Sequence, residues 1–189
     1  MTRAVAEPNT DYNGPFSGLT VPYRKGVKTY DGPVHSSPED LLIYRYALEN
    51  PGLYLHEVNI GPWLLPGSDL AHGAFNRRID AVRIPDLSTA HRWLNDGPDL
   101  IPVLHGTSRI EIIESKRRLD KASDSANVIG ELILALDLLD SLLPKLGAST
   151  EVLPPVVCCE KADVVVRRAL SSHCNGARVV EYGQLRPAW

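Results

Sequence analysis

Apolar residues recur along the chain with two different periods, and these periods separate predicted helices from predicted strands. Apolar positions spaced by three and four residues, as on an amphipathic helix, occupy residues 37–50, 125–146 and 162–173. Shorter apolar runs of strand length occupy residues 53–60, 77–84, 109–116, 152–159 and 177–182. The expected order is therefore a helix, three strands, a long helix, a strand, a helix and a last strand.

Turn and capping residues place the boundaries of these elements. Pro38 fits the first position of the first helix, and Pro51-Gly52 ends that helix. The connection between the second and third strands is expected to contain a short helix around residues 88–94. Residues 1–36 hold Gly, Pro, Asn and Ser without a sustained period. They are expected to form an N-terminal arm, and residues 37–189 to form one folded domain.

Composition and charge agree with a globular α/β protein that has one core. The 189 residues are 43% hydrophobic and 23% charged, with a net charge of −3, which is ordinary for a soluble domain. Nucleic-acid-binding proteins are often basic, so this net charge counts mildly against such a role, although local patches matter more. Three cysteines without paired spacing favour buried thiols in a reducing compartment over a disulfide scaffold or a zinc site.

Neither a membrane segment nor a secretion signal is visible in the pattern. No apolar run reaches the length of about 18 residues that a membrane span requires. The N-terminus also lacks the apolar core of a signal peptide. We therefore expect a cytoplasmic protein that does not interact with membranes.

Charged residues at the ends of apolar strands are the candidates for chemistry. The isoleucine-rich strand over 109–116 ends with Glu114 and Lys116, which alternation places on one side, with Ser115 on the other. A second acid, Asp80, lies in the apolar strand before it. Two carboxylates and a lysine on neighbouring strands are typical of a metal-dependent phosphodiesterase site. The alternative is that these are ordinary solvated charges at strand ends.

Cations and further acids surround this candidate site in the sequence. Four cations, namely Lys116, Arg117, Arg118 and Lys121, follow the strand closely, and Arg77 and Arg78 precede Asp80. Such side chains are suited to contacts with phosphates. Three other acids are candidates for an extra ligand, namely Glu39, Glu57 and Asp99. Helix capping already explains Glu39, and a surface position on an edge strand would explain Glu57.

Two segments of the chain resemble the R-R-x-D and hydrophobic-E-x-K signatures of the PD-(D/E)XK nuclease superfamily. They are Arg77-Arg78-Ile79-Asp80 and, further along the chain, Ile113-Glu114-Ser115-Lys116. Gly130-Glu131 resembles the Gly-Gln that often opens the following helix in that superfamily. The resemblance covers about residues 37–183 and includes the order of the elements. It implies a restriction-endonuclease-like fold, an α/β architecture with an α-β-β-β-α-β core and a mixed central sheet flanked by helices.

One departure from the signature is that isoleucine, not proline, precedes Asp80. Literal Pro-Asp pairs occur at Pro85-Asp86 and Pro98-Asp99. We prefer Asp80 because its strand is uninterrupted, whereas Pro102 falls inside the apolar stretch after Asp99, and proline removes a hydrogen-bond donor from a central strand.

The resemblance implies a metal-dependent endodeoxyribonuclease. Asp80 and Glu114 would bind Mg²⁺, with Mn²⁺ as an alternative, and Lys116 would position the attacking water. The flanking cations Arg77, Arg78, Arg117, Arg118 and Lys121 would contact the nucleic acid. DNA is favoured over RNA as substrate, and a homodimer is expected. The alternative is a catalytically silent nuclease-like domain that binds nucleic acid or a protein partner.

Overall fold

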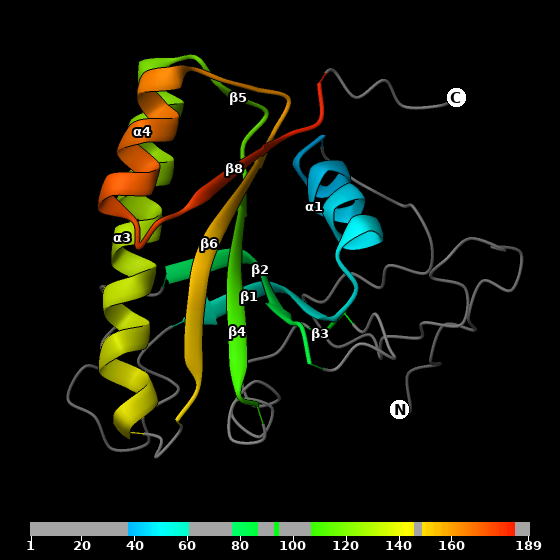
Figure 1. The fold of residues 1–189 in the computed structure, drawn as a ribbon, viewed down its shortest axis with the longest axis vertical. Coiled ribbons are helices and arrows are strands. Elements are labelled where there is room, and N and C mark those ends of the chain that lie inside the picture. Colours follow the sequence, from blue (N-terminus) through cyan, green and yellow to red (C-terminus); the bar gives the residue numbers. More distant parts are fainter. Residues whose placement is uncertain (1–37, 61–76, 87–92, 95–106, 146–148, 184–189) are drawn as a thin grey trace, which may run out of the picture.

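The computed structural model describes residues 38–60, 77–86, 93–94, 107–145 and 149–183. Its elements (Figure 1), in chain order, are α1 (Pro38–Glu49), β1 (Leu53–Ile60), β2 (Arg77–Ile84), β3 (Trp93–Leu94), β4 (Arg109–Ser115), β5 (Arg118–Leu119), α3 (Ala122–Lys145), β6 (Glu151–Cys159), β7 (Lys161–Ala162), α4 (Val164–His173) and β8 (Arg178–Glu181). The predicted N-terminal arm and Asp99 lie outside these ranges.

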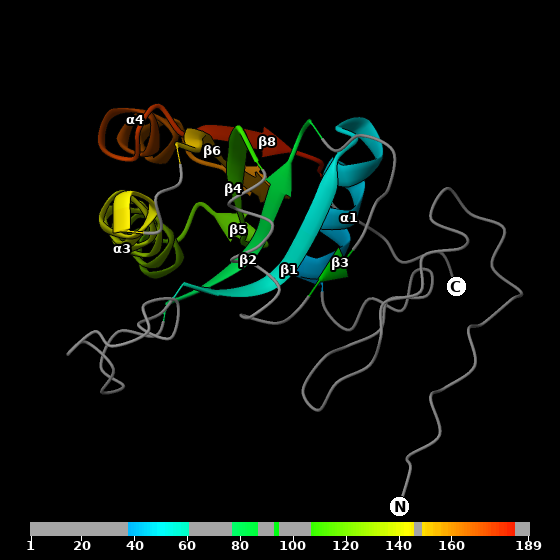
Figure 2. The same ribbon diagram turned by 90° about the horizontal axis from the view of Figure 1, so that it is seen from below.

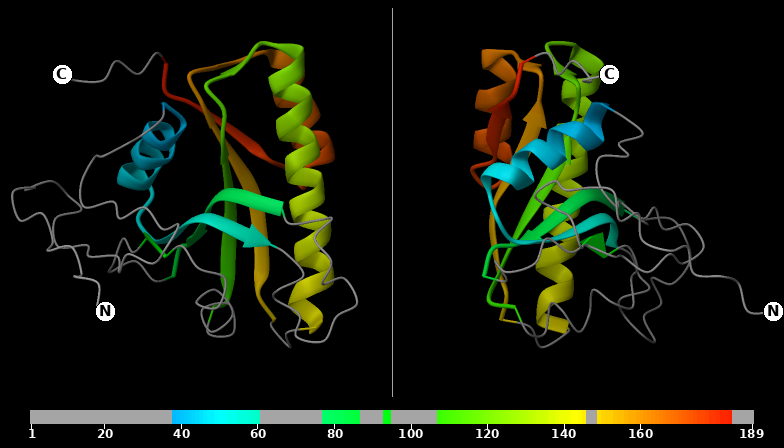
Figure 3. Two further views of the ribbon diagram at one scale, coloured as in Figure 1. Left: turned by 180° about the vertical axis from the view of Figure 1, so that it is seen from behind. Right: turned by 90° about the vertical axis from the view of Figure 1, so that its right-hand side faces the viewer.

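A mixed sheet with the strand order β3-β1-β2-β4-β6-β8 forms the centre of the protein. Strands β1, β2 and β4 are antiparallel neighbours, whereas β4, β6 and β8 run parallel. The connection from β4 to β6 passes through α3 and that from β6 to β8 through α4, since parallel neighbours need a long crossover. The sheet is strongly twisted, so that β1 and β2 cross the long direction of β4 and β6 (Figures 1 and 3).

Helices cover both faces of this sheet (Figure 2). Helices α3 and α4 lie side by side on one face, and α1 lies on the other. The larger cluster of buried apolar residues joins the sheet to α3 and α4, for example through Val82, Ile112 and Leu132. A smaller cluster joins the sheet to α1 and includes Ala81 and Ile113. Since neighbouring residues of one strand enter opposite clusters, the central strands read as continuous apolar runs.

The order of the main elements agrees with the prediction. The structure is an α/β fold with a mixed sheet. Helix α3 begins at Ala122, about one turn before the predicted start at 125. The prediction of a short helix around 88–94 is wrong at its end, because residues 93 and 94 form strand β3. Their backbones pair with Tyr54 and Leu55 at the edge of β1. Residues 88–92 lie outside the described ranges.

The two-residue strands β5 and β7 were not predicted, because two residues are too short to show a period. They pair in parallel to form a second, small sheet. The three cysteines are buried and free of disulfides, as their spacing indicates. Across the described part of the chain, no helix is both long and apolar enough to span a membrane.

Candidate active site

The register between β2 and β4 brings Asp80 and Glu114 together. The antiparallel ladder pairs Ala81 with Ile113 and Val82 with Ile112. Continued by one residue, the same register sets Asp80 opposite Glu114, and directly opposite residues share a face with Cβ atoms about 5 Å apart. That face is the one covered by α3, because Val82 and Ile112 belong to the α3 cluster. The two carboxyl groups are close enough for a side-chain hydrogen bond.

Two hydrogen bonds from Ser115 fix the carboxylate of Asp80. The backbone N–H of Ser115 donates to Asp80 Oδ2 at 2.8 Å, and the Ser115 hydroxyl donates to the same oxygen at 2.9 Å. Simple alternation predicted that Ser115 would point to the other side of the sheet. The structure nevertheless brings its hydroxyl within hydrogen-bond distance of Asp80.

Glu114 is a buried carboxyl group with a strongly perturbed ionisation. Its side chain is 1% exposed. Burial raises its pKa well above the usual value, and the negative charges of Asp80 and Glu131 raise it further, against the opposing effect of Lys116. Bringing a second carboxylate next to a buried one is unfavourable without a cation nearby. This arrangement is therefore suited to binding positive charge.

Lys116 follows directly after β4 and supplies one positive charge to the site. Its backbone N–H donates to the carbonyl of Cys158 at 3.1 Å, which continues the pairing with β6 beyond the end of β4. Its Nζ lies 3.2 Å from Oε2 of Glu131 on α3. Burial alone would lower the pKa of Lys116, but the surrounding carboxylates, Asp80 foremost, outweigh burial and raise it. The ammonium form is therefore the stable one.

Glu131 is a site residue whose role the sequence left open. It precedes Leu132, which packs in the core, so it lies at the border of the buried stripe of α3, with its side chain 23% exposed. From there it contacts Lys116 and acts electrostatically on Glu114. Its place after Gly130, where Gln is common in the nuclease superfamily, was the available signal.

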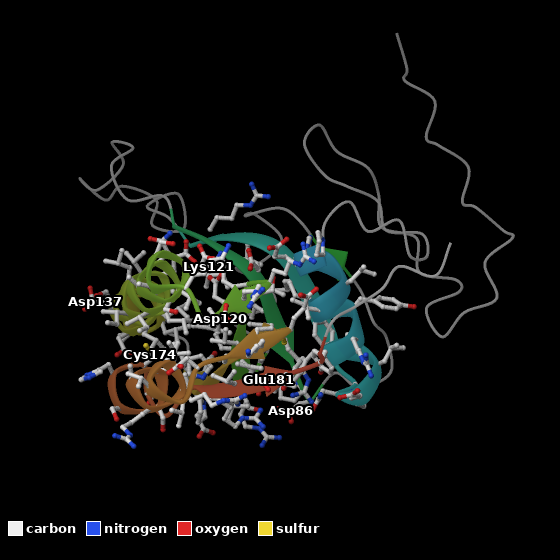
Figure 4. The ribbon with its side chains drawn as sticks, turned by 90° about the horizontal axis from the view of Figure 1, so that it is seen from above. Asp86, Asp120, Lys121, Asp137, Cys174 and Glu181 are labelled. Atoms are coloured by element: carbon white, nitrogen blue, oxygen red, sulfur yellow. The ribbon has the colours of Figure 1, made fainter. Side chains whose placement is uncertain are left out.

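The predicted cations occupy different positions. Arg78 is exposed on β2, and Arg77 begins that strand. Arg117 pairs with Glu160 at 3.1 Å, and Arg118 pairs with Asp120. Lys121 lies at the end of the molecule where β5 meets α3 (Figure 4).

Three of these cations, Arg117, Arg118 and Lys121, border a cavity of about 800 Å³, whereas Asp80 and Glu114 are not part of its lining. It is lined by Glu39, Lys116, Arg117, Arg118, Lys121, Asp124, Glu160, Lys161 and Gly183. Lys116 is therefore common to the cavity and to the group of carboxylates. The structure brings the predicted cations that follow β4 to the wall of one cavity.

The remaining candidate acids are placed as follows. Glu39 lines the cavity from α1. The backbone of Glu57 lies beside that of Asp80, because His56 pairs with Ala81 and Val58 with Ile79. Asp99 is outside the described residues.

Asp86, from the literal Pro-Asp pair at the end of β2, is part of a different group. It accepts a hydrogen bond from Ser108 at 2.6 Å and pairs with Arg109. It therefore joins the end of β2 to the start of β4, away from Asp80.

Searches against protein-family models, curated proteins and solved structures found no match for this chain. Within the described ranges, no three side chains among His, Cys, Asp and Glu are grouped as ligands of one metal ion. A pair of carboxylates is nevertheless sufficient for Mg²⁺, which is commonly bound through one or two carboxylates, several waters and substrate phosphates.

Proposed function

We propose that this protein is a Mg²⁺-dependent nuclease with a restriction-endonuclease-like fold, which hydrolyses phosphodiester bonds of DNA. The observation that supports it is the convergence of Asp80, Glu114 and Lys116 from two neighbouring strands. The mixed sheet and the helix order are those that the resemblance implies. Asp80 and Glu114 share a face by strand register, and Lys116 lies close enough to be affected by both charges.

The two carboxylates fit a hard divalent cation. Their donors are oxygens, which Mg²⁺ and Mn²⁺ prefer. Glu114 is buried beside a second negative charge, and a cation between the two groups would remove this repulsion. When bound, such an ion supplies positive charge that polarises a phosphoryl oxygen and stabilises charge in the transition state.

Each residue of the candidate site has a definite task in this reaction. Asp80 and Glu114 hold the cation, and the two donors of Ser115 keep the Asp80 carboxylate in one orientation. Lys116 orients the attacking water and stabilises the negative charge that develops on the phosphorus oxygens. Glu131 holds the ammonium group of Lys116 at the site and so limits the positions from which it can act.

Cleavage assays with single-site variants test this proposal. Purified protein is incubated with labelled DNA and RNA, as duplexes and single strands, with Mg²⁺, Mn²⁺ or EDTA. We expect cleavage with either metal and none with EDTA. Asp80→Asn, Glu114→Gln and Lys116→Ala should each lower the rate by at least about 100-fold, the usual effect of losing a general acid or base or an electrostatic group.

Asp86→Asn is the matched control, because it removes a carboxylate from the literal Pro-Asp pair without touching Asp80. It should cleave at the wild-type rate. Full activity in any of the three site variants contradicts the assignment. Binding of nucleic acid without cleavage under all of these metal conditions instead supports the alternative, a catalytically silent nuclease-like domain.

A further inference from the structure

The small sheet of β5 and β7 brings together two segments that are far apart in sequence. Its register pairs Arg118 with Lys161 and Leu119 with Ala162. Two backbone hydrogen bonds extend the pairing, from Glu160 to the carbonyl of Arg117 at 3.0 Å and from Asp163 to that of Leu119 at 3.2 Å. The result is a short two-stranded platform that begins immediately after Lys116.

This platform forms part of the wall of the cavity beside the candidate active site. Of the nine residues that line it, five are cations and three are acids. The lining therefore carries an excess of positive charge, and it includes Lys116 of the candidate site. A phosphodiester backbone is the ligand that matches a cationic cavity next to a candidate phosphodiesterase centre.

The cations of the cavity differ in how they are engaged. Arg117 is paired with Glu160 across the platform, and Arg118 with Asp120 two residues further along its own segment, so both guanidinium groups already have carboxylate partners. Lys121 and Lys161 are exposed, and neither forms an ion pair with a residue of the described ranges. Lysine presents a compact charge with three donors on a flexible stem, which suits contact with a moving chain of phosphates.

We infer that Lys121 and Lys161 bind successive phosphates of the nucleic-acid strand that leads into the active site. Arg117 and Arg118 contribute less to binding, because their guanidinium groups are already paired with carboxylates. This inference rests on the proposed function for the identity of the ligand, but it concerns binding and not cleavage. It adds Lys161, which lies 45 residues after Lys116 in the sequence, to the nucleic-acid contacts.

Binding measurements in EDTA test the inference without cleavage. Fluorescence anisotropy of a labelled DNA oligonucleotide is followed against protein concentration at several salt concentrations. Each lysine that contacts a phosphate contributes about 0.9 to the slope of log K against log salt for duplex, or about 0.7 for single strands. Lys121→Gln and Lys161→Gln should each reduce the slope by that amount. The double variant should reduce it by about 1.8 or 1.4, and weaken binding at least about tenfold near 0.1 M salt.

Arg168→Gln is the matched control. Arg168 is exposed on α4 and is not among the residues that line the cavity, and this variant loses the same single charge. It should bind with nearly the wild-type affinity and slope. Circular dichroism checks that all variants are folded, which is expected because both lysines are exposed.

Two results overturn the inference. The first is that the double variant binds DNA no more weakly than Arg168→Gln does. The second is that the wild-type protein binds no nucleic acid. Binding to an acidic protein in place of nucleic acid counts as this second result. The proposed function fails in a different way, since loss of cleavage in Mg²⁺ with lysine-dependent binding intact would refute catalysis alone.

Discussion

At the scale of single residues, the buried carboxylate Glu111 shows how this protein stabilises a charge in its core. Glu111 is 3% exposed. It accepts hydrogen bonds of 2.9 Å from Tyr46, Arg83 and Arg178. These donors come from α1, β2 and β8. A buried charge needs such partners, because an unpaired one is costly.

We therefore expect Glu111→Ala to destabilise the protein by about 3 kcal/mol, the usual effect of breaking a buried pair, because the half-buried Arg83 loses its carboxylate partner. Urea denaturation followed by circular dichroism measures this change. Arg178→Gln is the control, because Arg178 is 57% exposed and water can replace its bond; it should cost about 1 kcal/mol or less. Equal losses in the two variants would contradict this account.

The residues of the candidate site show what sequence can predict at this scale. Asp80, Glu114 and Lys116 were identifiable, because charges at the ends of apolar strands stand out against their surroundings. Ser115 was expected on the opposite side from Glu114, and strand alternation gave no signal that its hydroxyl would bond Asp80. Helix periodicity alone could not place Glu131 at the site, because it gives the position of a residue on a helix but not the strand that this position faces.

At the scale of elements, Asp86 links the residues after β2 to the start of β4, at the opposite end of β4 from the candidate site. Asp86 bonds Ser108 and Arg109 at the start of β4. The bond to the Arg109 guanidinium and, second, the bond from the Ser108 hydroxyl lower the pKa of Asp86 from near 3.8 to about 2. A carboxyl group with a lowered pKa stabilises the folded state above its unfolded pKa, and this stabilisation is lost as pH falls through the folded pKa.

It follows that the wild type should be more stable than Asp86→Asn above about pH 4, and that this difference should disappear as pH falls toward 2. The measurement is the free energy of unfolding of both proteins in urea across this pH range. The pair is exposed, so the difference should also shrink in high salt. A difference that persists unchanged at pH 2 would show that the bond to Arg109 does not cause it.

The elements that the sequence missed are those whose pairing comes from distant segments. Strands β5 and β7 have two residues each, and β3 also has two. Such strands are too short to show a repeating pattern of apolar residues. They form because a neighbouring segment supplies backbone N–H and C=O groups for pairing: β3 pairs at the edge of β1, and β5 pairs with β7. The long strands and helices were predictable because burial against the sheet imposes a period on their own residues.

At the scale of the whole molecule, the reactivity of the buried cysteines measures how often the central sheet opens. Cys158 and Cys159 belong to β6, which lies between β4 and β8, and Cys174 caps the end of α4. All three side chains are fully buried. Burial is the main cause that raises the pKa of each thiol, to about 12 for Cys159. The thiolate, which is the reactive form, is therefore scarce at neutral pH.

The native protein should consequently react with Ellman's reagent only as fast as it unfolds, and all three thiols should react at once in denaturant. Because exposure of β6 requires the sheet to open, the labelling rate of the two β6 thiols should follow global stability. Glu111→Ala should then speed labelling on the order of 100-fold, since about 3 kcal/mol corresponds to two powers of ten. Rapid labelling of the folded wild type, or a rate that Glu111→Ala leaves unchanged, would show that β6 opens locally without the rest of the fold.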